Sequence, residues 1–274
     1  MRSDLSYQPA LFASTSPLGE ADALVRFFAC PDGDMLLKAR GLRRSTAKLA
    51  QLLQPGDELA VRQARGRAQT GVLTGVIVHR GHPAWRASIR LLALYWFFIE
   101  SALTGSGAPP LNEQVYQLLV NLLRSEPAGE TAEYGALCAF CLKLFTLHGL
   151  LPSLAHCAID GHVLLPDEPV HLLPNGEGLV GRAAYNSRYA RSGGGLLRME
   201  ARRLARWQRL QHGALLDYAV AGADGWDAAV LLHHAAQRLS DLAAKPLPAA
   251  GFLRGSWKLA GIEQLLAVQR LSGR

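Results

Sequence analysis

Turn-forming residues divide the first 80 residues of the chain into short segments with the composition of β-strands. The apolar segments 24–29 and 35–39 flank the turn sequence Pro-Asp-Gly-Asp, which predicts a hairpin. Segments 58–63 and 71–78 predict two further strands, and segment 46–54 has a helical pattern. Several short strands within one stretch predict a small barrel, and an OB-fold is the barrel that suits a basic chain.

From residue 84 onward the apolar residues recur at helical spacing instead. The segments predicted to be helices are 84–104, 112–125, 131–147, 196–219, 226–243 and 258–271. The chain is therefore predicted to be an α+β protein. An N-terminal OB-fold β-barrel in residues 1–80 precedes a larger α-helical domain in residues 81–274, with an irregular insertion at 157–195.

Composition favours a cytoplasmic protein without a membrane partner. The chain has 274 residues, of which 49% are hydrophobic, so it can bury a sizeable core. Its longest apolar run, 91–99, is about half as long as a membrane span. The chain begins without the pattern of a secretory leader, and four cysteines are too few for a disulfide framework.

Positive charge is concentrated between residues 36 and 90, where the only acidic residues are Asp57 and Glu58. The basic residues there are Lys38, Arg40, Arg43, Arg44, Lys48, Arg62, Arg65, Arg67, Arg80, Arg86 and Arg90. Acids within the segment cannot neutralise this excess, so it favours an anionic partner, first of all a nucleic-acid backbone. The alternative is a solvated surface with scattered salt bridges.

Phosphate contacts that position a strand without reading its sequence are the expected role of these cations. The candidates in the first part of the chain are Lys38, Arg40, Arg43, Arg44, Lys48, Arg62, Arg65 and Arg67. A second basic run, 182–209, contains Glu200 as its only acid, and from it we select Arg202 and Arg206. With Arg198 and Arg209 they have helical spacing, which predicts that they share one face. That face is interpreted as a second DNA surface or as a docking site for an acidic peptide tail, and the alternative is an ordinary polar helix face.

The sequence gives little indication of an enzyme. It contains no phosphate-binding loop, no Gly-x-Ser-x-Gly and no His-Glu-x-x-His, and its acids do not cluster, so we assign no catalytic residue. Cys138 and Cys141 form a Cys-x-x-Cys inside an apolar helical run, where cysteine behaves as a small hydrophobic residue. An unconventional metal site that includes Cys157 remains the alternative.

Several ordered motifs resemble the RecO family of bacterial recombination mediators. Residues 39–45, Ala-Arg-Gly-Leu-Arg-Arg-Ser, with 52–55, Leu-Leu-Gln-Pro, resemble the most recognisable stretch of that family. Residues 144–152 followed by Cys157, and residues 252–259, resemble its later motifs. The resemblance spans nearly the whole chain, although each motif is short.

This resemblance implies an N-terminal OB-fold and a C-terminal helical domain. It implies binding of single- and double-stranded DNA, annealing of complementary strands and recombinase loading, in the cytoplasm at the nucleoid. Its partners would be RecR and the acidic C-terminal tail of the single-stranded-DNA-binding protein. The alternative is an RNA-binding or translation-associated OB-fold protein.

The chain departs from the family in its zinc module, where many members carry two Cys-x-x-Cys pairs. The corresponding positions here are Cys157, Asp160, Gly181 and Ala184. A structural zinc site usually needs four Cys or His ligands, and only Cys157 qualifies. We therefore expect a metal-free loop and no cofactor.

Overall fold

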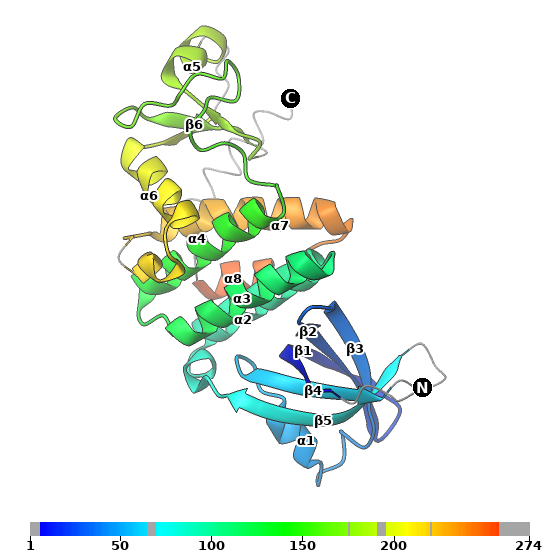
Figure 1. The fold of residues 1–274 in the computed structure, drawn as a ribbon. Coiled ribbons are helices and arrows are strands. Elements are labelled where there is room, and N and C mark those ends of the chain that lie inside the picture. Colours follow the sequence, from blue (N-terminus) through cyan, green and yellow to red (C-terminus); the bar gives the residue numbers. More distant parts are fainter. Residues whose placement is uncertain (1–5, 65–69, 175, 191–195, 220, 258–274) are drawn as a thin grey trace. The chain divides into compact units, whose positions relative to one another are not determined.

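The computed structural model describes residues 6–64, 70–174, 176–190, 196–219 and 221–257 (Figure 1). The chain divides into two compact units, Met1–Glu126 and Pro127–Arg274. The predicted division after residue 80 coincides with the end of the last barrel strand at Arg80. As a boundary between two domains, that division stays a prediction.

Five strands of the first unit close into a barrel with the order β1-β2-β3-β5-β4 (Figure 1). The strands are β1 (Gln8–Leu18), β2 (Asp22–Ala29), β3 (Gly33–Ala39), β4 (Glu58–Ala64) and β5 (Gly71–Arg80). All neighbouring strands pair antiparallel except β3 and β5, which pair parallel. A short helix, α1 (Lys48–Leu52), connects β3 to β4. This arrangement confirms the predicted OB-like barrel followed by a helical region.

Alternating side chains decide which face of each strand forms the barrel core. In β3, Met35, Leu37 and Ala39 are buried, while the residues between them point outward. Gly33 begins this strand with φ +78°, a conformation that the turn before it requires and that glycine adopts without strain. The hairpin predicted from segments 24–29 and 35–39 is therefore present, with Phe27 paired to Met35.

The strand β1 is absent from the elements predicted by pattern. Its first half, Ala10–Ala13, is buried, but its last five residues are all exposed. A bulge between Phe12 and Ser14 shifts the register, so no single alternation runs through the strand. Pairing with β2 and β4, rather than a local pattern, holds these residues extended.

Helices complete the first unit and are anchored to the barrel. They are η1 (Pro83–Arg86), α2 (Ile89–Thr104) and α3 (Pro109–Ser125). Ser88 caps α2 by accepting a hydrogen bond from the Leu91 amide at 3.2 Å. The Tyr95 hydroxyl of α2 donates to the Phe12 carbonyl of β1. The buried indole of Trp85 donates to the Leu123 carbonyl at 2.9 Å and so joins η1 to α3.

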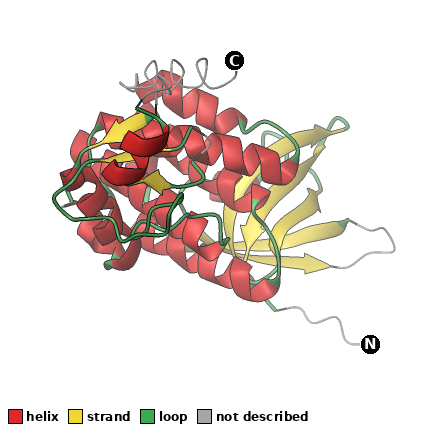
Figure 2. Cartoon of the chain, turned by 90° about the horizontal axis from the view of Figure 1, so that it is seen from above, coloured by secondary structure: helices red, strands yellow, loops and turns green. Residues whose placement is uncertain are grey.

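The second unit combines helices with a small sheet. Its helices are α4 (Glu130–Leu147), α5 (Arg182–Arg188), α6 (Ala201–His212), η2 (Leu215–Ala219), α7 (Gly225–Ala243) and α8 (Pro248–Trp257). The strands β6 (Val170–Leu172), β7 (Leu179–Val180) and β8 (Leu197–Met199) form a sheet with the order β7-β6-β8. Figure 2 distinguishes the long strands of the barrel from these short ones. The helix α4 contacts α6, η2 and α7.

Two predictions for the second unit are wrong. The segment 196–219 is not one helix: it contains β8, α6 and η2, because Leu197 and Met199 alternate with Arg198 and pair with β6. The insertion 157–195 is not irregular throughout, since it contains β6, β7 and α5. The predicted helix 258–271 lies outside the described residues, and α8 has no counterpart among the predicted elements.

Candidate nucleic-acid interface

The loop between β3 and α1, residues 40–47, carries Arg40, Arg43 and Arg44 and is tied to the turn between β1 and β2. The Gly41 amide donates to an Asp22 carboxylate oxygen at 2.9 Å. The Arg43 amide donates to the Ala21 carbonyl at 3.0 Å, and its guanidinium Nη1 donates to the Gly19 carbonyl at 2.6 Å. These bonds hold the loop backbone and the Arg43 guanidinium in place before any partner binds.

The cations in and beside this loop differ in how far they are neutralised. Arg40, Arg43, Arg44 and Lys48 are exposed. Among the described residues, no carboxylate lies within ion-pair distance of Arg44 or Lys48. Lys38, on the outer face of β3, pairs with Asp22 at 2.9 Å. The hydrogen bond from the Gly41 amide and then the one from Lys38 hold the pKa of the Asp22 carboxyl below its ordinary value.

Strand register brings a further predicted cation to the same surface of the barrel. Lys38 pairs with Val72, and Val72 pairs with Ala64, so the ends of β3 and β4 flank the start of β5. Arg62 lies on β4 with its guanidinium carbon 5.3 Å from the centre of the Tyr7 ring. Arg65 and Arg67 lie outside the described residues. The loops at this end correspond to those that bind ligands in OB-folds.

The eleven cations of segment 36–90 do not form one face. Arg80 ends β5 at the far end from Gly71, the residue that pairs with Leu37. Arg86 donates to Asp57 at 2.6 Å and to the Pro55 carbonyl at 2.7 Å. The candidate interface is therefore the smaller set that remains at one end of the barrel, which we call the basic end: Lys38, Arg40, Arg43, Arg44, Lys48 and Arg62.

A cavity of about 360 Å³ opens beside the fixed loop in the basic end. Its lining residues are Phe12, Thr15, Ser16, Pro17, Ala23, Leu42, Arg43, Ala50 and Leu53. Leu42 and Leu53 make part of this lining apolar, and Thr15 and Ser16 of β1 contribute hydroxyls. Arg43 supplies a positive charge, and the described lining residues include no acid. Its charge and polarity suit an anionic ligand with an apolar part.

The second basic run does not present one continuous face. Arg198 lies on β8 and pairs with Glu200 at 3.3 Å, while Arg202 on α6 is exposed. Arg206 has a side chain that is only 14% exposed, and it donates to the buried carboxylate of Asp227 on α7. Arg202 is thus available to a ligand, whereas Arg206 joins α6 to α7.

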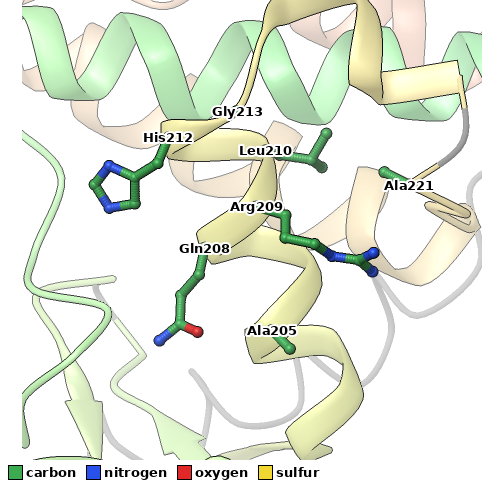
Figure 3. A pocket seen from close by; sticks show the side chains of 7 residues that line it. All are labelled: Ala205, Gln208, Arg209, Leu210, His212, Gly213 and Ala221. Carbon is green, nitrogen blue, oxygen red and sulfur yellow. The ribbon is translucent and has the colours of Figure 1, made fainter.

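A second cavity, of about 770 Å³, lies along α6 (Figure 3). Its lining residues are Ala205, Gln208, Arg209, Leu210, His212, Gly213 and Ala221. Figure 3 shows Arg209 and Leu210 extending toward Ala221, so a cation and an apolar side chain share one wall. The Gln208 amide is already bound, since it donates to the Leu154 carbonyl at 2.8 Å.

The residues at the zinc-module positions do not fit a zinc ion. The Gly181 amide donates to Cys157 Sγ at 3.4 Å, and neither Gly181 nor the buried Ala184 offers a metal ligand. Asp160 hydrogen-bonds to Cys157 and to the His162 amide, and these bonds hold its pKa below the ordinary value. Within the described ranges, no three His, Cys, Asp or Glu side chains come together as metal ligands. The ring of His171 on β6 stacks on the ring of Tyr185 on α5, with ring centres 3.6 Å apart, and this contact packs the small sheet against α5 without a metal ligand.

The cysteines of the Cys-x-x-Cys motif lie in the core of the second unit. Cys138 and Cys141 are fully buried in α4, and burial raises the pKa of both thiols. Buried thiols of this kind behave as small hydrophobic side chains. No helix in the described ranges is both long and apolar enough to span a membrane.

Comparison with known proteins finds relatives that carry the same name, DNA repair protein RecO. A "DNA repair protein RecO" from Nocardioides sp. is 30% identical over 159 residues, which cover 56% of this chain and 63% of the relative. The proteins of that name from Myxococcus xanthus and Streptomyces griseus are 29% and 31% identical, over 56% and 54% of this chain and 62% of each relative. The matched regions therefore span less than two thirds of the length of these relatives. No protein-family model matches the chain.

Proposed function

We propose that the chain is a divergent member of the RecO family and that it acts in DNA repair and recombination by binding DNA at the basic end of its barrel. The observation that carries the proposal is the loop 40–47. Three hydrogen bonds to Asp22 and to the turn between β1 and β2 hold its backbone and the Arg43 guanidinium, while the Arg40 and Arg44 side chains are exposed. A loop whose backbone is already ordered loses less conformational freedom when its cations bind a phosphate backbone.

The work of such a protein requires no covalent chemistry. Two DNA strands repel each other through their phosphates, and cations that neutralise both strands lower the barrier to pairing. We therefore propose annealing of complementary strands and assistance in recombinase loading, with single- and double-stranded DNA as partners at the nucleoid. The sequence contains no recognised catalytic motif, and a binding role needs none.

Measurement of DNA affinity as a function of salt tests the proposal. The logarithm of the binding constant for single-stranded DNA is expected to fall linearly with the logarithm of salt concentration. Arg44→Glu is expected to weaken binding to all sequences alike and to reduce the slope by about 0.7 for each phosphate that the variant no longer neutralises. The matched control is Arg80→Glu, an exposed arginine at the other end of β5.

Two results would contradict this function. Affinity that does not depend on salt would exclude phosphate contacts, and an equal effect of both charge reversals would exclude the basic end as the specific surface. Competition with structured RNA of equal length separates DNA repair from the alternative of an RNA-binding OB-fold protein. A clear preference for RNA would favour that alternative.

The cavity along α6 supports a proposal for a protein partner. We propose that it receives an acidic peptide with an apolar end, as in the tail of the single-stranded-DNA-binding protein, because Leu210 and Ala221 line it together with Arg209 and the described lining residues include no acid. A labelled tail peptide should bind at low salt, and Arg209→Glu should weaken it. Arg202→Glu, an equal charge change on the same helix but outside the lining, is the control; an equal loss in both variants would count against the cavity. RecR is proposed as a further partner, with no surface assigned to it.

A further inference from the structure

The exposed aromatic side chain of Tyr7 lies next to the basic end, and phosphate binding alone gives it no role. Tyr7 immediately precedes β1 and is 39% exposed. Its hydroxyl end lies over Gly75 of β5: a Cβ atom built on that glycine would be 2.7 Å from the Tyr7 hydroxyl oxygen. A glycine inside a strand removes a side chain where another group approaches closely. The outer face of the barrel is thus open at the point where the tyrosine lies.

Arg62 completes this arrangement from the strand between. Gln8 pairs with Val61 and Arg62 pairs with Gly75, so Tyr7, Arg62 and Gly75 adjoin across β1, β4 and β5. The guanidinium carbon of Arg62 is 5.3 Å from the ring centre of Tyr7, within the range of a cation–π contact. Its Nε is buried and has no hydrogen-bond partner in the described part of the chain. The arginine is therefore held against the ring and not by a carboxylate.

The same face continues with an exposed apolar residue. Ile77 lies two positions beyond Gly75 on β5, on the same side of the strand, and is 44% exposed. An aromatic ring, a guanidinium plane and an aliphatic side chain thus form a surface with both charge and flat apolar area. Binding of unpaired nucleotides uses this combination, because every base has a π-face that stacks on aromatic rings while arginine supplies charge.

We propose that Tyr7 and Arg62 form a stacking platform for an unpaired base, and that this platform favours single strands over duplex at the basic end. The inference rests on the proposed function, because the base that stacks on the platform belongs to the same DNA strand whose phosphates contact the cations of the basic end. A duplex base has both faces covered by its neighbours and offers this surface only phosphates. The platform therefore adds affinity for single-stranded DNA alone.

Binding of three DNA ligands by the full chain tests the platform. The ligands are an oligothymidylate strand, a strand of the same length with abasic sites in place of bases, and a duplex. Tyr7→Ala is expected to lose roughly 5- to 150-fold in affinity for oligothymidylate. It should change the affinity for the abasic strand and the duplex by less than about twofold, because those ligands present no free base face. Tyr7→Phe keeps the ring and should bind like the parent protein.

A further variant separates aromatic stacking from apolar contact. Tyr7→Leu keeps an apolar side chain over Gly75 but has no aromatic face. If this variant binds oligothymidylate as tightly as the parent protein does, the proposal is overturned. An equal loss on all three ligands in Tyr7→Ala would also overturn it, because it would indicate a general disturbance of the surface. If the parent protein binds none of the ligands, the proposed function fails; if Arg44→Glu weakens binding while Tyr7→Ala does not, only the platform fails.

Discussion

Replacing Asp227 by asparagine is expected to destabilise the second unit by about 3–5 kcal/mol, the usual cost of leaving a buried ion pair without one partner. Asp227 is fully buried near the start of α7, with an exposed fraction of 0%. Its carboxylate accepts from Arg206 and from the Trp207 indole at 3.0 Å, and Arg203 lies within 3.2 Å. The substitution keeps the shape of the side chain and removes its charge.

The size of the effect depends on the partners that Arg203 and Arg206 retain after the substitution. The side chain of Arg203 is 16% exposed and that of Arg206 is 14% exposed, so water solvates their positive charges only weakly once the Asp227 charge is removed. Arg203 retains Asp224 at 2.7 Å, whereas Arg206 retains Asp224 only at 3.9 Å. The asparagine carbonyl can still accept from Trp207, which places the expected loss toward the lower end of the range.

Urea unfolding followed by circular dichroism measures this loss as a change in the free energy of unfolding. The matched control is Asp241→Asn, the same substitution at an exposed position of α7, which should change stability by less than about 0.5 kcal/mol. If Asp227→Asn costs no more than this control, the buried network does not stabilise the unit and the reasoning is refuted.

Three further predictions concern charge, metal and thiols. Burial raises the pKa of the Glu58 carboxyl, but hydrogen bonds from Arg124 and His82 outweigh this effect and hold the pKa below its ordinary value. The Glu58 carboxylate therefore stabilises the folded state at pH values above the pKa of the unfolded chain, and this stabilisation is lost as pH falls through the pKa of the folded state. Glu58→Gln should therefore cost about 1.5–3 kcal/mol at neutral pH and less in acid, and a cost independent of pH would contradict this. A metal chelator should leave the unfolding midpoint unchanged, because Gly181 and Ala184 offer no ligand; a lower midpoint would show a structural metal. A thiol reagent should modify Cys30, which is partly exposed, before the buried cysteines of α4, and an equal rate for all would contradict their burial.

Local sequence patterns determined most of the barrel and the charge at its end. The apolar segments 24–29 and 35–39, with the turn sequence between them, predicted β2, β3 and their hairpin. The cations around Gly41 were also visible in the sequence, since they are adjacent along the chain. The lack of metal ligands at two of the zinc-module positions was also visible in the sequence, because the side chains of Gly181 and Ala184 have no ligand atoms.

Other features depend on contacts between segments that are distant in the sequence. Arg202 and Arg206 look alike in the sequence, yet one is exposed and the other meets Asp227, because helix packing and not spacing decides which side of α6 is covered. The single sequence signal for the Tyr7 platform was a glycine inside a strand at Gly75, which marks an open surface but not what lies over it. The sequence by itself therefore determined most of the barrel strands, several helices and the basic loop, but not β1, β8 or α8. Only the tertiary structure decided which cations remain free, because strand register and helix packing assign each charge its partner.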